Sequence, residues 1–345
     1  MEAHPSIALV LLNYNGKEYL QKNLPLVKGA SYGNKKIYVI DNHSDDDSVS
    51  YLQQNHPDVL VIQNEKNFGY AGGYNKGLSH IKAEYYFLLN TDIEVTPNFI
   101  EPIISRMEND PTVGICQPKI LSISRKNYFE YAGAAGGWID IFGYTFARGR
   151  VFDYYEEDVG QYNDDCNIFW ASGACMVIRS SVFKTLNGFY DHFFMYWEEV
   201  DLCWRALAGG HRVVYCPDAV IYHQETDKLL YQSPKRLYYL FRNNLIMMHR
   251  NLPLSSLAWT LPARLVLNFV ALFYFIARGH FRIAGSNVLA HLHYARWIFS
   301  NDRREPRAAN KTSLHRIGPV YKGSLIYQYY LLKKKKFSDI IRLKN

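Results

Sequence analysis

Apolar runs alternate with helix-length segments over the first ninety residues of the chain. Residues 7–12 and 36–40 are largely apolar runs of strand length, and similar runs occupy residues 59–62 and 85–89. An apolar run without polar alternation is typical of a strand that is buried on both faces. The segments between these runs have the length of helices. This order of elements predicts an α/β fold with a doubly wound, mostly parallel sheet and right-handed crossovers.

Polar residues follow three of these predicted strands. The first strand ends in NYNG, the second in DNHSDDDS, and the strand of residues 85–89 in NTDIE. In doubly wound sheets, ligands bind beyond the carboxyl ends of the strands. We therefore expect a binding site at this edge of the sheet.

Two carboxylates at this edge have a functional and a structural interpretation. Asp92, at the mouth of the sheet, can bind a hard cation that also holds a diphosphate. Asp41 can accept a hydrogen bond from a nucleobase or a ribose hydroxyl. Both could instead be turn or cap residues, because Asp is favoured in such places. The glycine-rich run 67–77 lets backbone approach a ligand, but it does not match a phosphate-binding P-loop.

A second polar cluster interrupts the apolar stretch 194–223. Three acidic residues open a predicted helix, namely Glu198, Glu199 and Asp201. Carboxylates at a helix start complement the helix dipole, which is the structural explanation. Aromatic neighbours favour a functional one, because Tyr196 and Trp197 would desolvate a carboxylate and raise its pKa toward values useful to a general base. Two short predicted strands then lead to His223.

Charge divides the chain into two regions. The net charge of +7 combines residues 1–225, with 18 Lys and Arg against 28 Asp and Glu, and residues 226–345, with 21 against 4. This asymmetry predicts an acidic catalytic body and a basic tail that meets something anionic, either membrane phospholipid or nucleic acid. The five cysteines have no CxxC spacing, so they indicate neither a zinc site nor a disulfide framework. A scattered, odd set of cysteines without a signal peptide is typical of the cytoplasm.

The ordered motifs together resemble a known family. They are VLLNYNG, VIDNHSDDDS, NFGYAGGYNKGL, LLNTDIEV, GACMVIRSSVFKTLNGFYDHFFMYWEEVDLCWR and PDAVIYH. This set, over about residues 6–225, resembles the family-2 inverting glycosyltransferases of the GT-A fold. Within that family it is most similar to the bacterial rhamnosyltransferase-like branch that builds surface polysaccharide. The resemblance implies an enzyme that moves a sugar from a nucleotide donor to a saccharide acceptor.

The resemblance also implies roles for individual residues. Around the nucleotide base it places Asn13, Tyr14 and Asp41. The segment that lines the ribose and the donor sugar contains Asn67, Gly69, Gly72 and Asn75. Thr91 and Asp92 are expected to contact the nucleotide sugar. Asp92 corresponds to the last Asp of the family's DxD-type motif and would hold Mg²⁺ or Mn²⁺ on the diphosphate. His223 matches a His that completes the metal site in some relatives, and a satisfied His at a strand end is the alternative.

The acidic pair Glu198 and Glu199 occupies the position of the family's ED or DD pair, whose second member is the general base. By this resemblance Glu199 deprotonates the acceptor hydroxyl, while the metal stabilises the leaving nucleoside diphosphate. The chain departs from the family pattern twice. Asn90 stands at the first DxD position, which leaves the metal affinity open. Glu instead of Asp at position 199 adds a methylene of reach.

The basic tail contains a candidate membrane segment. Residues 235–250 predict a basic amphipathic helix, and residues 265–277 form a 13-residue, almost wholly apolar run. The longer segment 257–277 is interrupted by Pro262, Arg264 and Asn268, and a span needs about 20 apolar residues. We therefore expect a helix that lies on the cytoplasmic face of the inner membrane, held by anionic lipid. A buried core helix or a dimer interface is the alternative.

Two other functions remain open at this point. One is a non-catalytic scaffold that binds nucleotide-sugar or carbohydrate, and the other is a membrane-embedded polysaccharide synthase. Processive synthases carry a QxxRW motif, whereas here His293 precedes Arg296-Trp297 at the Gln position. We expect a single-addition transferase with a saccharide, lipid-linked acceptor. The resemblance to the rhamnosyltransferase-like branch favours TDP-rhamnose as donor. The same fold could also bind UDP- or GDP-sugars. No motif supports nucleic acid as a partner. The irregular residues 122–166 could shape the acceptor site.

Overall fold

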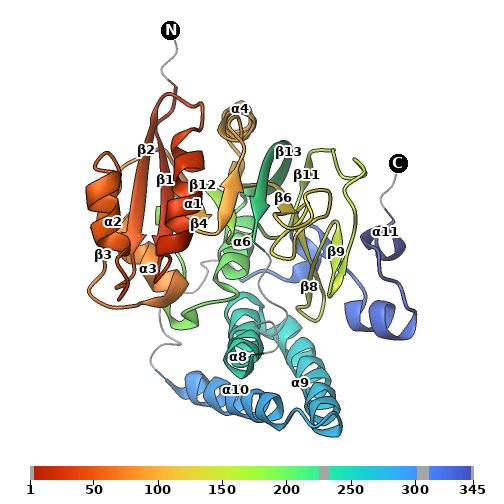
Figure 1. Ribbon diagram of the computed structural model, residues 1–345. Coiled ribbons are helices and arrows are strands. Elements are labelled where there is room, and N and C mark those ends of the chain that lie inside the picture. Colours follow the sequence, from red (N-terminus) through yellow and green to blue (C-terminus); the bar gives the residue numbers. More distant parts are fainter. Residues whose placement is uncertain (1–3, 225–232, 301–310, 343–345) are drawn as a thin grey trace.

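The computed structural model describes residues 4–224, 233–300 and 311–342. Its N-terminal part is built around a large mixed sheet (Figure 1). The strand order is β11-β13-β6-β12-β4-β1-β2-β3, with β5 beside β13. In chain order the strands are β1 (Ile7–Asn13), β2 (Lys35–Asp41), β3 (Leu60–Gln63), β4 (Tyr85–Asn90), β5 (Ile93–Val95), β6 (Val113–Ser122), β11 (Cys166–Asn167), β12 (Cys175–Arg179) and β13 (Arg212–His223). Strands β3, β2, β1 and β4 are parallel, as the sequence predicts. The antiparallel strand β12 separates β4 from β6.

Helices cover both faces of this sheet. They are α1 (Lys17–Lys28), α2 (Ser48–Asn55), α3 (Gly69–Leu78), α4 (Ile100–Asn109), α5 (Ser180–Thr185) and α6 (Glu198–Ala208), with the short helix η1 (Asp191–Phe193) before α6. Strand β1 shows why its sequence lacks polar alternation. Ala8 and Val10 pack into one hydrophobic core, and Leu9 and Leu11 pack into a second core on the other face. The predicted doubly wound α/β architecture is confirmed.

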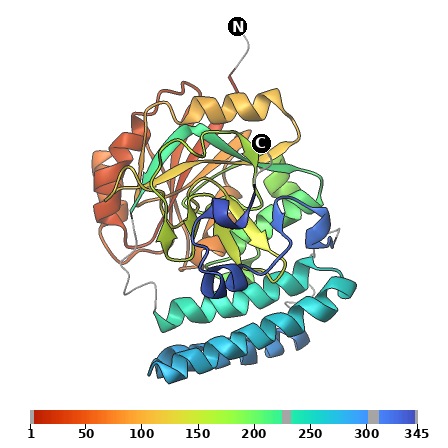
Figure 2. The same cartoon turned by 90° about the vertical axis from the view of Figure 1, so that its right-hand side faces the viewer.

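The region 122–166, expected to be loop-rich, contains part of a second, small sheet. Its strands are β7 (Gly137–Asp140), β8 (Thr145–Ala147), β9 (Arg150–Val151), β10 (Tyr154–Tyr155) and, from the C-terminal region, β14 (Val320–Tyr321). The C-terminal segment also contains η3 (Leu314–Arg316), η4 (Tyr327–Leu331) and α11 (Phe337–Ile340). Phe337 packs against Trp138, with ring centroids 5.3 Å apart. The end of the tail therefore packs against the small sheet (Figure 2). The predicted boundary at residue 225 lies outside the described residues.

Three long helices lie below the sheet in Figure 1, namely α8 (Pro234–Asn251), α9 (Leu254–Ala277) and α10 (Phe281–Phe299). Helix α8 matches the predicted basic helix. Helix α9 continues through Pro262, and its polar residues Arg264 and Asn268 face the protein. Arg264 lies 3.6 Å from the ring centroid of Tyr144, and the amide of Asn268 lies 3.2 Å from His291 Nε2.

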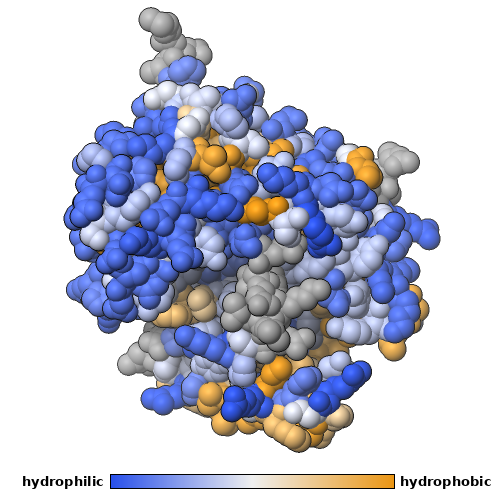
Figure 3. All heavy atoms as spheres, viewed as in Figure 1, coloured by the Kyte–Doolittle hydropathy of each residue, from blue (hydrophilic) through white to orange (hydrophobic). Residues whose placement is uncertain are grey.

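The outer face of α9 is apolar and exposed. Within the described residues α9 is the one helix long and apolar enough to cross a membrane, and 17% of its most apolar window is buried. Exposed side chains of this face include Val266, Phe269, Val270, Phe273 and Tyr274. Figure 3 shows hydrophobic residues along the lower rim of the molecule. The expectation of a short, interrupted apolar segment thus needs correction, because the interrupting polar residues point inward and leave a longer helix apolar outside.

Candidate functional site

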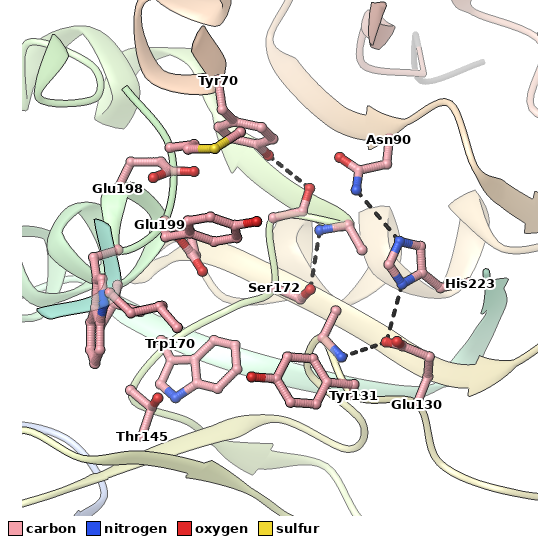
Figure 4. Close-up of a pocket in the computed structure, with 18 of the residues that line it drawn as sticks. Tyr70, Asn90, Glu130, Tyr131, Thr145, Trp170, Ser172, Glu198, Glu199 and His223 are labelled. Atoms are coloured by element: carbon pink, nitrogen blue, oxygen red, sulfur yellow. Dashed lines mark hydrogen bonds and ion pairs between the residues drawn. The ribbon is translucent and has the colours of Figure 1, made fainter. Parts of the chain in front are cut away.

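A cavity of about 300 Å³ opens beyond the carboxyl end of β4 (Figure 4). Four of the sequence-predicted site residues line it, namely Asp92, Glu198, Glu199 and His223. The other polar and aromatic residues of its wall include Tyr70, Asn90, Glu130, Tyr131, Arg150, Trp170, Ser172, Tyr196 and Arg236. Figure 4 shows Glu198 and Glu199 on one side of the cavity and His223 with Glu130 on the other. The fold therefore brings Asp92, which follows β4, into the same cavity as Glu198, Glu199 and His223, which come much later in the sequence.

One side of the cavity is a chain of carboxylate, imidazole and carboxylate. Asp92 follows β4, and its Oδ1 lies 3.2 Å from Nε2 of His223, the last residue of β13. His223 Nδ1 lies 3.1 Å from Oε2 of the buried Glu130. Burial opposes the charged imidazolium, but Glu130 and Asp92 outweigh it and raise the pKa of His223 to about 10. Burial likewise opposes the charged form of Asp92, and His223 nevertheless lowers the pKa of that carboxyl.

These residues fit a divalent cation that is shared with a substrate. Asp92 offers a carboxylate oxygen, and His223 offers Nε2 once its proton leaves. Glu130 faces the opposite ring nitrogen, which is the arrangement that orients metal-binding histidines. No cluster of three or more His, Cys, Asp or Glu side chains suited to a metal occurs in the described ranges. A Mg²⁺-type ion often takes one or two protein ligands and completes its shell with water and phosphate oxygens, so the pair suffices chemically.

The other side of the cavity holds two carboxylates, each with one buried oxygen that accepts no hydrogen bond from the described residues. Glu198 and Glu199 open α6, and Oε2 of each is buried without a hydrogen-bond partner in the described chain. Burial raises the pKa of Glu199 to about 7. Burial and the neighbouring Glu199 raise the pKa of Glu198 well above its usual range. A carboxylate with a pKa near neutrality is suited to general-base catalysis, as the aromatic neighbours in the sequence indicated.

The segment before α6 adopts an uncommon backbone conformation. Phe194, Tyr196 and Trp197 all have positive φ angles, of 64°, 66° and 78°. Such conformations cost free energy in residues with a side chain and persist where the surroundings hold them. The amide of Asn243 in α8 lies 2.9 Å, 2.8 Å and 2.9 Å from the carbonyl oxygens of Phe193, Met195 and Tyr196. Helix α8 therefore holds the segment that aims the Glu198–Glu199 pair into the cavity.

The residues predicted around a nucleotide base lie at the ends of β1 and β2. Asn13 and Asp41 are buried side by side, and Asn13 Nδ2 donates to Asp41 Oδ1 over 2.9 Å. Asp41 also accepts from the Ser44 hydroxyl at 2.6 Å. Tyr14 is exposed at this edge. Thr91 accepts a hydrogen bond from the Asn23 amide at its backbone oxygen. The predicted edge of the sheet thus assembles these residues, and their contacts with a base remain a prediction.

The residues predicted beside the donor sugar make structural contacts around α3. Gly69 has a φ of 73°, and a Cβ there would lie 2.3 Å from the carbonyl oxygen of Phe194. Gly72 is equally confined, since a Cβ would lie 2.9 Å from that of Phe68. Asn67 accepts from the Gly69 backbone N–H, and Asn75 both donates to and accepts from the Phe189 backbone. None of the four lines the cavity. A role in sugar binding remains a prediction for them.

Sequence reasoning missed several residues of the cavity wall. Glu130 is the clearest case, because it contacts His223 although it lies in the region read as a loop-rich insertion. Arg150, Trp170 and Arg236 come from three further elements or loops. No motif marks them. The expectation that residues 122–166 could shape the acceptor site covers Glu130 and Arg150, whereas Trp170 and Arg236 lie outside that range. A role of this region in acceptor binding remains a prediction.

Comparison with known families and proteins gives a consistent result. The family model described as glycosyl transferase family 2 matches residues 8–186. A low-salt glycan biosynthesis hexosyltransferase of Haloferax volcanii is 26% identical over 70% of this chain and 74% of its own length. An N-acetylglucosaminyl-diphospho-decaprenol L-rhamnosyltransferase of Mycobacterium tuberculosis is 22% identical over 76% of this chain and 91% of its own.

Solved structures share the fold at low sequence identity. GalNAc-T7, solved with UDP, GalNAc and Mn²⁺, gives a TM-score of 0.57 at 15% identity over 72% of this chain and 48% of its own. A mannosyltransferase of Pyrobaculum calidifontis, solved with GDP-Man and Mn²⁺, gives 0.53 at 14% identity over 87% and 89%. These similarities identify the fold as GT-A.

Proposed function

Because the chain belongs to glycosyl transferase family 2, we propose that it moves a sugar from a nucleotide-sugar donor to a saccharide acceptor during glycan synthesis, with inversion at the anomeric carbon. One observation carries this proposal. A single cavity holds a carboxylate of raised pKa, Glu199, opposite a metal-compatible pair, Asp92 and His223. Both named relatives are sugar transferases, and the first is named for glycan biosynthesis, which supports the assignment.

The donor half of the proposed site lies at the carboxyl ends of β1, β2 and β4. Asn13, Tyr14 and Asp41 would contact the nucleotide, and Asp92 with His223 would hold Mg²⁺ or Mn²⁺ on the diphosphate. When bound, the ion supplies positive charge that stabilises the leaving nucleoside diphosphate. The solved neighbours contain Mn²⁺ with UDP or GDP-Man, which supports a divalent ion and leaves the nucleotide of this enzyme to experiment.

The acceptor half contains the proposed base. Glu199 takes the proton from the acceptor hydroxyl as its oxygen attacks the anomeric carbon, and the bond to the diphosphate breaks on the opposite face. A single displacement of this kind inverts the anomeric centre. Glu198 lies deeper and is 4% exposed. Burial and the neighbouring Glu199 raise the pKa of Glu198, which favours the protonated form of Glu198 beside the proposed base.

The apolar outer face of α9 supports a place on the cytoplasmic face of the inner membrane. An exposed apolar helix face close to many cations is typical of interfacial binding to anionic lipid. Helix η4 also exposes apolar residues, and the four lysines Lys333–Lys336 follow it. This segment therefore combines apolar and cationic side chains as well. Such a position would bring the cavity close to a lipid-linked saccharide, and the mycobacterial relative is named for a decaprenol-linked acceptor.

Nucleotide binding tests the proposed site. We expect one of UDP, TDP, GDP or CDP to raise the melting temperature in the presence of Mn²⁺, because a ligand that binds only the folded state stabilises it. The shift should disappear in Asp92→Ala. Glu94→Gln is the matched control, since Glu94 lies two residues away and pairs with Lys22 rather than with His223. No shift with any nucleotide would favour a carbohydrate-binding scaffold instead.

Vesicle binding tests the membrane proposal. We expect the protein to sediment with vesicles that contain phosphatidylglycerol and less with phosphatidylcholine alone. The double variant Phe269→Ser, Phe273→Ser should weaken binding at least about tenfold, because each Phe would lose apolar burial in the lipid. Val159→Ser removes an exposed apolar side chain away from α9 and serves as control. Equal sedimentation of the double variant and the wild type would rule out α9 as the contact.

A further inference from the structure

The cavity wall carries two guanidinium groups around one tyrosine ring. Arg150 of β9 lies 4.0 Å from the ring centroid of Tyr131, and Arg236 of α8 lies 5.2 Å from it. Both arginines line the cavity, and they are 7% and 9% exposed. Arg236 also lies 5.3 Å from the ring centroid of Tyr196. Two buried cations from distant parts of the chain thus converge on one aromatic surface.

Arg150 is the more informative of the two. A buried guanidinium normally pairs with a carboxylate, because the desolvated charge is otherwise costly. In the described ranges no carboxylate forms an ion pair with Arg150, and its Nε donates to the carbonyl oxygen of Phe152 over 3.1 Å. Glu130, the residue before Tyr131, faces His223 instead. The buried charge of Arg150 therefore faces a cavity without its own counterion.

The ionisation of Tyr131 reflects the same positive potential. Burial opposes loss of the phenol proton, but Arg150 and Arg236 outweigh that effect and lower the pKa of Tyr131. The electrostatic field at this wall thus favours negative charge. Arginine forms paired, charge-assisted hydrogen bonds with phosphate, so a phosphate group is the chemical match for guanidinium groups that border the same tyrosine ring in one cavity.

Arg150 lies away from the strands that carry the predicted nucleotide residues. Strands β1 and β2, which carry the predicted nucleotide residues, lie on one side of Figure 1, and β9 lies on the other, beyond β4 and β6. We propose that Arg150 and Arg236 bind a phosphate group of the acceptor, next to the saccharide that receives the sugar. This assignment of an acceptor rests on the proposed function. Tyr131, Trp170 and Tyr196 supply aromatic surfaces for the saccharide itself.

The test uses phenyl phosphate as probe and tryptophan fluorescence as readout, because Trp170 and Trp197 line the cavity. We expect saturable binding to the metal-free wild type, and affinity at least tenfold lower in Arg150→Gln and in Arg236→Gln. Arg150→Lys should recover part of it. Arg106→Gln is the control, since Arg106 pairs with Asp165 and lies outside the cavity wall. Circular dichroism and melting temperature establish that each variant is folded.

Two further arms separate this inference from the proposed function. Asp92→Ala should bind phenyl phosphate as the wild type does, even though it loses nucleotide binding. Arg150→Gln should bind the nucleoside diphosphate with Mn²⁺ within about twofold of the wild type. Wild-type affinity for phenyl phosphate in folded Arg150→Gln, or no saturable binding in the wild type, would overturn the proposal. A tenfold loss of nucleoside diphosphate affinity in Arg150→Gln would assign the arginine to the donor and would overturn it as well.

Discussion

Two groups of carboxylates share one cavity and differ in the charge around them. Glu198 and Glu199 are neighbours, and no Lys, Arg or His of the described residues forms an ion pair with either. Burial raises the pKa of both. Asp92 and Glu130 flank His223, which keeps the pKa of Asp92 below its ordinary value against the effect of burial. The same functional group is therefore suited to accept a proton on one side and to stay anionic beside a cation on the other.

The largest expected effect is a loss of turnover when Glu199 is replaced, because only the Glu198–Glu199 group contains the proposed base. In Glu199→Gln we expect kcat to fall by about 10²–10⁴, the usual contribution of a general base. Donor and metal binding should remain, because Asp92 and His223 are untouched. Steady-state rates of transfer and the nucleotide-dependent rise in melting temperature measure the two effects.

The melting temperature of Glu199→Gln at different pH values shows whether the variant is folded and whether Glu199 has a raised pKa. The folded protein binds the Glu199 proton more tightly than the unfolded chain does, since burial raises the pKa from 4.5 to about 7. Stability from this group is therefore present at low pH and is lost as the pH rises through about 7. The Gln variant should melt at a higher temperature than the wild type at pH 8. Turnover within a few-fold of the wild type would remove Glu199 from the role of base.

A smaller effect is expected from the other group, at Glu130. Removing a carboxylate that orients a metal-binding His typically costs about 10–100-fold in metal affinity or activity. We expect Glu130→Gln to raise the Mn²⁺ concentration needed for nucleotide binding by that factor and to leave binding at saturating metal intact. Glu157→Gln, an exposed site in the same region, should have no effect. An unchanged Mn²⁺ requirement in Glu130→Gln would separate Glu130 from the metal site.

The two groups also differ in how far the sequence predicts them. Glu198 and Glu199 are neighbours in one motif, and Asp92 follows an apolar strand, so pattern alone points to them. Glu130 reaches His223 because its backbone N–H bonds to the Ile120 carbonyl of β6, and β6 pairs in parallel with β13. No local pattern encodes this long-range pairing. The small sheet escaped prediction for a related reason, since its strands have as few as two residues and one of them comes from the C-terminal region.

The long helix α9 shows a second limit of sequence reasoning. Composition alone cannot tell on which side of the helix Arg264 and Asn268 lie, so they appeared to break an apolar segment. In the structure both are buried against neighbouring elements, with Arg264 Nη1 donating to the Phe142 carbonyl oxygen over 3.1 Å. By contrast, strands β1 and β4 were predictable from the sequence. Both of their faces are buried, so apolar side chains are favoured on either face.

The smallest expected effect is a change in how turnover depends on pH. This dependence should follow Glu199 and not the Asp92–Glu130 group. Only unprotonated Glu199 can accept the acceptor proton, so its raised pKa should limit kcat on the acidic side. We expect kcat to be constant above about pH 8 and to fall roughly tenfold per unit below about pH 7. An ordinary glutamate, with a pKa of 4.5, would place this fall two to three pH units lower. Measurements at saturating donor, acceptor and Mn²⁺ keep metal loss from contributing, and Glu130→Gln should keep the same midpoint. Loss of the step in Glu199→Gln would assign it to the base, whereas an unchanged step there would assign it to another group in the cavity.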